Sequence, residues 1–297
     1  MPFQELNRDE INRRAEKARD MLGKCAICPH GCGVNRLAGE TGFCRAGGRA
    51  VISSYGRHTG EERVLTGIRG SGTIFFGYCN LACEFCQNYE ISHGGEGEEV
   101  SAGELAGIML EMQRLGCHNV NLVSPSHYVP QILQALAPAL EGGLRVPIVY
   151  NTGGYDAVPM LRLLEGLVDI YMPDIKFGAD QTAANYTGAP RYFSAVRPAV
   201  REMHRQVGDL QLDDRGLAVR GLLVRHLVMP GGLAGTAEVM RFLAEEVSPD
   251  TFVNVMAQYH PAHRALKHPE LSRRVTGREC REAVKSAREA GLHRFAE

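Results

Sequence analysis

The 297-residue sequence lacks three features that would place the protein at a membrane or on nucleic acid. No uninterrupted apolar stretch approaches the roughly 18 residues that indicate a membrane helix. The formal net charge is −1, so there is no excess of positive charge of the kind that binds nucleic acid. The first residues are polar and lack the apolar core of a secretory signal. We therefore expect a cytoplasmic protein with neither a membrane nor a nucleic acid as partner.

What the sequence does contain is cysteine, and its nine cysteines are grouped. Four lie within residues 25–44 and three within residues 79–86, while Cys117 and Cys280 stand alone. In a reducing compartment such grouping indicates metal binding instead of a disulfide framework. The two single cysteines are interpreted as ordinary buried or half-buried residues.

The group of three has the spacing Cys79-x3-Cys83-x2-Cys86. Thiolates at this spacing can ligate three of the irons of an iron–sulfur cube and leave the fourth iron open, because ferredoxin-type clusters take four ligands. An open iron on a redox cluster can bind a small molecule and pass it an electron. The alternative interpretation is a zinc knuckle.

This spacing, together with Gly77, Tyr78 and Phe85, resembles the radical S-adenosylmethionine (SAM) superfamily. The run from Cys86 to Ser92 and the cysteine-rich N-terminal segment also resemble uncharacterised homologues of the pyruvate formate-lyase activating enzymes. The resemblance implies an oxidoreductase in which SAM chelates the open iron. One electron from a reduced [4Fe–4S] cluster then yields methionine and a 5′-deoxyadenosyl radical. It further implies that Tyr78 and Phe85 lie at the cofactor and that a ferredoxin or flavodoxin supplies the electron.

After residue 70 the pattern alternates between strands and helices. Strands are predicted at 73–76, 120–123, 146–150, 168–172, 222–228 and 252–256. Helices are predicted at 101–115, where Ser101 and Glu104 form a capping-box pattern, and at 129–140, 158–166, 192–207 and 278–290. Six such units indicate an α/β fold with a parallel sheet and right-handed crossovers. The resemblance favours a partial (β/α)6 barrel, while a doubly wound sheet is the alternative.

The first part of the chain is expected to be a small cysteine-rich, metal-binding appendage. An amphipathic helix is predicted over 9–21, capped by Asn7 or Asp9. Short β-like pieces are expected after it, around 50–52 and 63–65. We place the boundary so that residues 1–68 form the appendage and residues 69–297 the core domain.

Polar residues follow the second predicted strand, and parallel α/β folds bind ligands beyond the carboxyl ends of their strands. Ser124 and Ser126 could accept hydrogen bonds from the SAM ammonium group, in place of the Gly-Gly-Glu segment of related enzymes. Ser126 could also cap the next helix. His127 is a candidate acid or base on the substrate side.

The third and fourth predicted strands end in segments that resemble the SAM-handling region of the activating enzymes. There the resemblance places a monovalent cation at Asn151, Thr152, Met172 and Asp174. This chain has asparagine at 151 where the relatives have aspartate, so one negative charge is missing. Asp174 and Lys176 lie two residues apart and share one face of a regular strand. They are candidate catalytic residues, or alternatively a partly buried ion pair.

Arg225 lies on the fifth predicted strand and is expected to point into the barrel. A guanidinium there needs a carboxylate partner, which could belong to SAM, to the substrate or to a structural acid. We therefore include Arg225 among the candidate catalytic residues.

A second metal site is predicted near the N-terminus. Its ligands are Cys25, Cys28, Cys32 and Cys44, and the glycines between them allow tight turns. Four thiolates suit either a closed structural zinc or a second iron–sulfur cluster.

Three functions are consistent with these patterns. The first is a radical SAM enzyme whose radical abstracts a hydrogen from a small molecule or peptide. The second is an activase that acts on a backbone glycine of a partner protein. The third is a metal-stabilised binding module without catalysis, which would hold zinc at both cysteine groups and leave SAM intact.

Overall fold

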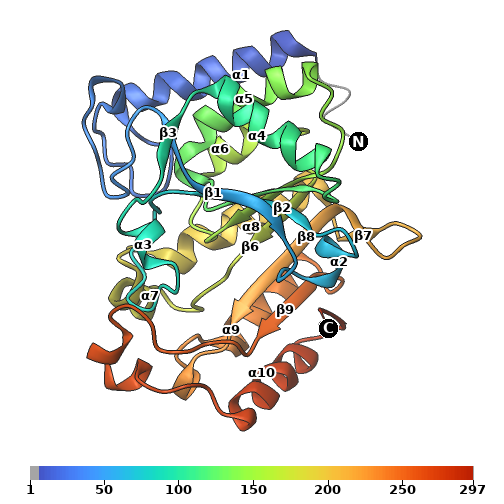
Figure 1. Ribbon diagram of the computed structural model, residues 1–297. Coiled ribbons are helices and arrows are strands. Elements are labelled where there is room, and N and C mark those ends of the chain that lie inside the picture. The colour runs from blue at the N-terminus through green and yellow to red at the C-terminus, as the bar shows by residue number, and fades with distance from the viewer. Residues whose placement is uncertain (1–6, 297) are drawn as a thin grey trace.

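A parallel sheet curved into a partial barrel dominates the computed structural model, which describes residues 7–296 (Figure 1). Its six parallel strands are β2 (Ser71–Phe76), β4 (Val120–Val123), β5 (Ile148–Thr152), β6 (Ile170–Pro173), β8 (Ala218–Leu227) and β9 (Phe252–Met256). Their order in the sheet follows the chain without reversal. The six-unit partial barrel is therefore confirmed, and the doubly wound alternative is wrong because that fold reverses its strand order at a switch point.

Four further strands extend or flank this sheet. They are β1 (Ala50–His58), β3 (Glu98–Val100), β7 (Gln211–Leu212) and β10 (Arg294–Phe295). β1 runs antiparallel between β2 and β3, while β10 runs parallel to β9 at the other end. Because β1 pairs with β2, the sheet continues across the boundary predicted at residue 68.

The predicted helices are present. They are α1 (Arg8–Asp20), α4 (Ala102–Arg114), α5 (Val129–Glu141), α6 (Val158–Leu163), α8 (Tyr192–Val207) and α10 (Gly277–Glu289). The Asn7 side chain caps α1, and Ser101 with Glu104 forms the predicted capping box of α4. Helices pack outside the barrel, and α1 lies along α5 (Figure 1).

Shorter helices were not predicted. They are α2 (Arg63–Thr66), α3 (Tyr89–Ser92), α7 (Asp180–Thr187) and α9 (Thr236–Phe242). Residues 63–65 were expected to be β-like. Instead the Glu62 carbonyl accepts bonds from Leu65 and Thr66, and the helical turn inserts Leu65 into the barrel.

Apolar side chains close the barrel at the amino ends of its strands. Leu65, Val149, Ile170, Leu223 and Phe252 form one buried cluster near the amino ends of the strands. The carboxyl ends carry polar residues instead, which places the open part of the interior where parallel α/β barrels bind ligands.

Candidate active site

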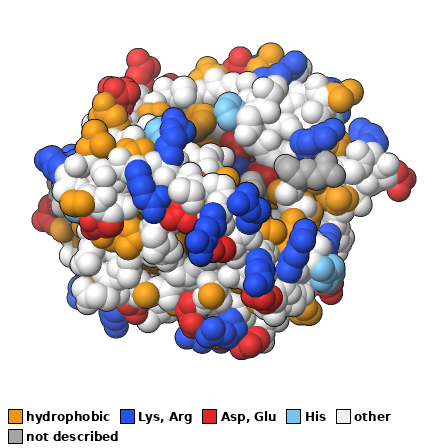
Figure 2. All heavy atoms as spheres, turned by 90° about the horizontal axis from the view of Figure 1, so that it is seen from below, with side chains coloured by type: hydrophobic (Ala, Val, Ile, Leu, Met, Phe, Trp, Pro, Cys, Tyr) orange, Lys and Arg blue, Asp and Glu red, His pale blue; other side chains and the backbone are white. Residues whose placement is uncertain are grey.

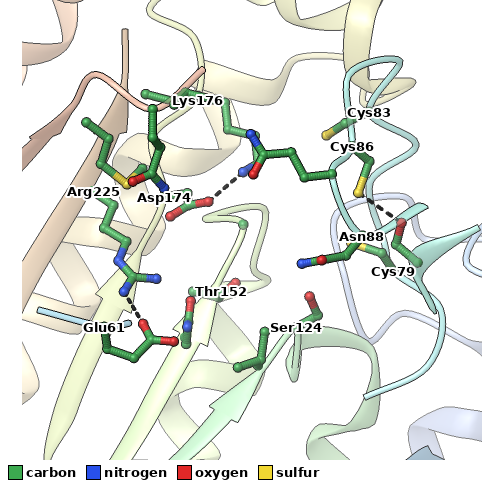
Figure 3. Close-up of a pocket in the computed structure, with 18 of the residues that line it drawn as sticks. Glu61, Cys79, Cys83, Cys86, Asn88, Ser124, Thr152, Asp174, Lys176 and Arg225 are labelled. Atoms are coloured by element: carbon green, nitrogen blue, oxygen red, sulfur yellow. Dashed lines mark hydrogen bonds and ion pairs between the residues drawn. The ribbon is translucent and has the colours of Figure 1, made fainter. Parts of the chain in front are cut away.

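A cavity of about 940 Å³ opens at the carboxyl ends of the parallel strands. Its volume falls in the range of small-molecule sites, about 300–1,000 Å³. Figure 3 shows Cys79, Cys83 and Cys86 on one side of it, with Asp174 and Arg225 on the other. The cavity therefore brings a cysteine loop and charged strand-end residues to a single space.

The loop after β2 presents three cysteines to this cavity. Its backbone turns sharply, because Tyr78 has a φ of 64° and the Gly77 amide donates to Val51. A Cβ at Gly77 would lie 2.7 Å from Val51 Cγ1, so this close approach requires glycine. Burial raises the pKa of the Cys79 thiol to about 11 and raises that of Cys83 as well. These thiols would be protonated at neutral pH unless a metal took the place of the proton.

The three cysteines of this loop are free thiols that line the same cavity. An iron–sulfur cube takes each thiolate on a different iron. Three thiols of one loop that line one cavity match the donor set of a cube with one open iron.

Asp174 and Lys176 form the ion pair that was one of the two predicted interpretations. Lys176 Nζ lies 2.5 Å from Asp174 Oδ2, and the two side chains are 17% and 25% exposed, respectively. Burial lowers the pKa of Lys176, but the neighbouring Asp174 carboxylate outweighs it and holds that pKa above its usual range. Both groups line the cavity, so the pair offers one cation and one anion to whatever binds there.

The turn after β5 is held by a buried carboxylate that the sequence analysis missed. Thr152 Oγ1 donates to Asp156 Oδ2 over 2.6 Å, and the Tyr150 hydroxyl donates to Oδ1 over 2.9 Å. Burial raises the pKa of Asp156. No motif marked this residue. It nevertheless places a carboxyl group beside Thr152, near the position where Asn151 lacks one.

The structure places Ser126 and His127 away from the cavity lining. Ser126 is not a helix cap, because its Oγ lies 2.8 Å from Thr152 Oγ1 inside the fold. His127 is buried and donates from Nε2 to the Gly77 carbonyl. Burial lowers its pKa to about 3. The chain turns back toward the cysteine loop here, and His127 contacts Gly77 instead of the cavity. Its acid–base role stays a prediction.

Ser124 keeps its expected position. It lines the cavity beside Asn151, whose carbonyl accepts the Ser124 amide hydrogen over 2.9 Å. Its φ of 58° is unusual for a non-glycine residue and turns the chain at the strand end. Tyr78 and Phe85 also line the cavity, and Phe85 packs 5.9 Å from Phe177, ring centre to ring centre.

Arg225 pairs with structural acids, the third of the partners considered for it. Its Nε donates to Glu62 Oε1 over 2.7 Å, and its guanidinium also contacts Glu61. Asn254 donates to the same Glu62 oxygen. Burial alone would raise the pKa of Glu62, but Arg225 and Asn254 hold it below its usual value. The segment just before β2 thus contacts β8 through Arg225 and β9 through Asn254.

The acids at 61 and 62 were not predicted as site residues. They precede the first barrel strand, whereas ligand-binding residues of a parallel α/β fold are expected after the carboxyl end of each strand. A pair of carboxylates next to Gly60 gave no spacing signal that could link them to Arg225.

The N-terminal cysteine segment lies against the cysteine loop of the cavity. His30 Nε2 donates to the Asn80 carbonyl over 3.0 Å. Burial, and to a lesser degree the nearby Cys25, Cys32 and Cys44, raises the pKa of the Cys28 thiol to about 12. The four thiols are thus mutual neighbours, although no three of them converge on one point in the described part of the chain.

Comparison with known proteins places the chain among known folds. No family model matches it. The uncharacterized protein MJ0674 of Methanocaldococcus jannaschii is 31% identical over 291 residues, which are 95% of this chain and 79% of that protein. Within residues 7–296, every helix is too short or too polar to cross a membrane.

Three solved structures share the fold. Streptococcus suis SuiB bound to its precursor peptide SuiA is 14% identical, with a TM-score of 0.50 over 74% of this chain and 46% of SuiB. Native anSMEcpe with bound AdoMet is 10% identical, with a TM-score of 0.50 over 74% of this chain and 61% of that one. HydG, a maturase of the [FeFe]-hydrogenase, is 12% identical, with a TM-score of 0.50 over 99% and 63%. The chain thus spans less than two thirds of each, and the fold is that of radical SAM enzymes.

Proposed function

The chain belongs to the same protein family as MJ0674 of Methanocaldococcus jannaschii, and we propose that it is a radical SAM enzyme. The observation that carries the proposal is the placement of Cys79, Cys83 and Cys86 on one wall of a cavity whose opposite wall is charged. The shared fold with a structure that contains AdoMet supports it. Three cysteines match the ligand set of a [4Fe–4S] cluster with an open iron.

Each wall of the cavity would then have a task. The three cysteines would hold the cluster, which when bound supplies the electron that splits SAM into methionine and a 5′-deoxyadenosyl radical. Ser124 and Asn151 would accept hydrogen bonds from the SAM ammonium group. Lys176 would attract the carboxylate of a bound ligand, and Tyr78 with Phe85 would pack against its base.

The closure of the barrel at the amino ends of its strands supports radical chemistry. Apolar side chains fill the interior next to the cavity at the amino ends of the strands, and they exclude water from that end. Exclusion of water protects a reactive intermediate from side reactions. Because the cavity is about 940 Å³, a small molecule or the end of a peptide fits beside SAM. SuiB, which shares the fold, has been crystallised with a peptide, and this supports the same substrate class here.

Anaerobic reconstitution tests this function. The protein is loaded with iron and sulfide, given SAM and dithionite, and assayed for 5′-deoxyadenosine and methionine. Formation of both products, even slowly and without substrate, is the expected result. A protein with its full complement of iron that leaves SAM intact would refute the proposal. Transfer of the radical to a glycine of a co-expressed partner, detected by electron paramagnetic resonance, would instead identify an activase.

Lys176→Met is expected to make the cluster harder to reduce. The substitution removes the positive charge that lies beside Asp174 and near the thiolates. Loss of the attraction between this charge and an added electron costs about 1–2 kcal/mol at a protein-like dielectric. For a one-electron transfer that energy corresponds to a reduction potential about 40–90 mV more negative. Redox titration of the reconstituted protein measures it, with Lys285→Met on the exposed surface of α10 as the matched control. Equal potentials in all three proteins would contradict the role of Lys176.

For the N-terminal segment we propose a second iron–sulfur cluster, because four neighbouring thiols can ligate the four irons of a cube. The wild-type protein should then bind about eight irons per chain, four per cube, and Cys28→Ala about four. Elemental analysis of both proteins gives the count. One zinc and about four irons in the wild type would assign a structural zinc instead, and Cys28→Ala should then mainly impair folding.

A further inference from the structure

One face of the molecule lies directly over the cysteine loop. The segment after β9 crosses this loop, and the Arg264 amide donates to the Glu84 carbonyl over 2.8 Å. The rings of His263 and Tyr89 stack with centres 4.9 Å apart. Glu84 lies between Cys83 and Cys86 in the chain, so this face is one residue away from the thiols that would hold the cluster.

Large apolar side chains are exposed on this face. Leu266 is 72% exposed on a short helical turn, Ala265–Lys267, and Tyr89 is 41% exposed beside the cysteine loop. Phe43 is 38% exposed and stacks on His30, which contacts Asn80 in the same loop. Exposed apolar side chains that gather around one feature mark a surface that contacts another protein.

The segment that crosses the loop is basic, although the chain as a whole is not. Residues 260–275 contain four Lys and Arg against one Glu, a net charge of +3 in a protein whose net charge is −1. Figure 2, which views the molecule from below, shows Lys and Arg side chains spread across that face with hydrophobic and acidic ones between them. Lys267 and Arg45 are exposed close to the loop, and the charge of Arg45 reaches His93. Acids also lie here. Glu90 and Glu270 are exposed, and half-buried Glu84 already contacts Arg264 and His268.

We propose that this docking surface receives a small acidic ferredoxin that reduces the cluster. The inference rests on the proposed radical SAM function. In the transfer, one electron leaves the reduced ferredoxin cluster and one enters the cluster of this protein, without bond formation or proton transfer. Low-potential ferredoxins, near −400 mV for the plant type, supply the reducing power. Apolar side chains flanked by positive charge suit an acidic partner, because complementary charge speeds association with a partner that binds only transiently. The residues are Phe43, Arg45, Tyr89, Leu266 and Lys267.

The docking surface is separate from the cavity. None of its five residues is among those that line the cavity in the described part of the chain. A substitution there can therefore change delivery of electrons without touching the site of SAM binding.

Stopped-flow reduction of the reconstituted protein tests the docking surface. The variant Leu266→Asp/Lys267→Glu is mixed anaerobically with a reduced ferredoxin or with dithionite, and bleaching of the cluster absorbance is followed without SAM. We expect the ferredoxin-driven rate to fall at least about tenfold and to lose much of its salt dependence. The dithionite-driven rate should stay within about twofold. Arg19→Glu on α1, far from this face, is the matched charge-reversal control (Figure 1).

A second variant, Arg45→Asn, protects the test against misfolding, since asparagine tolerates the φ of 60° at this position. It should lower the ferredoxin-driven rate by about threefold. An unchanged ferredoxin rate in both variants overturns the proposal, as does an effect confined to flavodoxin. A protein that binds no cluster at all refutes the proposed function, and the docking surface falls with it.

Discussion

Replacement of Cys83 by alanine should abolish SAM cleavage. A cube with two protein ligands cannot be held in the cavity, and the reaction has no other source of its electron. The rate of 5′-deoxyadenosine formation should drop at least about 1,000-fold, which corresponds to about 4 kcal/mol of barrier. The measurement is chromatography of the products after anaerobic incubation with SAM and dithionite, together with the iron content of the purified protein.

Cys280→Ala is the matched control for this experiment. Cys280 is a half-buried cysteine on α10, and the sequence interpretation assigns it no metal. It should keep both the iron content and the activity of the wild type. Equal activity of Cys83→Ala and Cys280→Ala would show that the loop does not hold the catalytic cluster.

Arg225→Met should destabilise the protein more than any other single change at the cavity. The substitution leaves the buried carboxylates of Glu61 and Glu62 without their cation, and loss of one partner of a buried pair costs about 3–5 kcal/mol. Because these residues connect β8 with the segment before β2, the loss also loosens the open side of the barrel. Equilibrium unfolding in urea at pH 7.5 measures the difference, and Arg278→Met in an exposed ion pair should have a much smaller effect.

The same variant should show a distinctive dependence on pH. In the wild type Arg225 holds the pKa of Glu62 below its ordinary value of 4.5, so ionised Glu62 stabilises the fold above that pH. This contribution is lost as the pH falls through the folded-state pKa. Without Arg225, burial alone would raise the pKa of Glu62, and mild acid would neutralise it. The stability gap between variant and wild type should therefore narrow from pH 7.5 to pH 5, and an equal gap at both would exclude the unpaired carboxylates as its cause.

Local patterns account for the predictions that the structure confirms. The capping box of Ser101 and Glu104 predicts the start of α4 correctly, because both residues lie within the helical turn whose backbone they cap. Each buried strand could be recognised from a short apolar run, since a strand of a parallel sheet is covered on both faces. Six such runs separated by helices were enough to predict the partial barrel.

The residues whose surroundings differ from expectation have partners that are distant in the chain. His127 follows a strand, as a catalytic residue would, but its ring turns inward to Gly77. Ser126 meets Thr152 instead of a helix terminus. The direction in which a side chain points after a strand depends on the loop that packs against it. No local sequence pattern predicts that packing.

The sequence by itself determined the chemistry that this protein can support. The spacing of Cys79, Cys83 and Cys86 is a local property, because one short loop has to present all three thiols. The strand ends likewise follow from the alternation of elements, which is why Asp174, Lys176 and Arg225 could be chosen in advance.

Only the tertiary structure decided which polar groups face the cavity and which support it. Asp156 and Glu62 could not be recognised, because a buried carboxylate is stable only through partners that the fold brings to it, here Thr152 and Arg225. The basic and apolar face over the cysteine loop was equally invisible. It forms when the segment after β9 returns to Glu84, and contacts between such distant parts of the chain arise only once the sheet has curved.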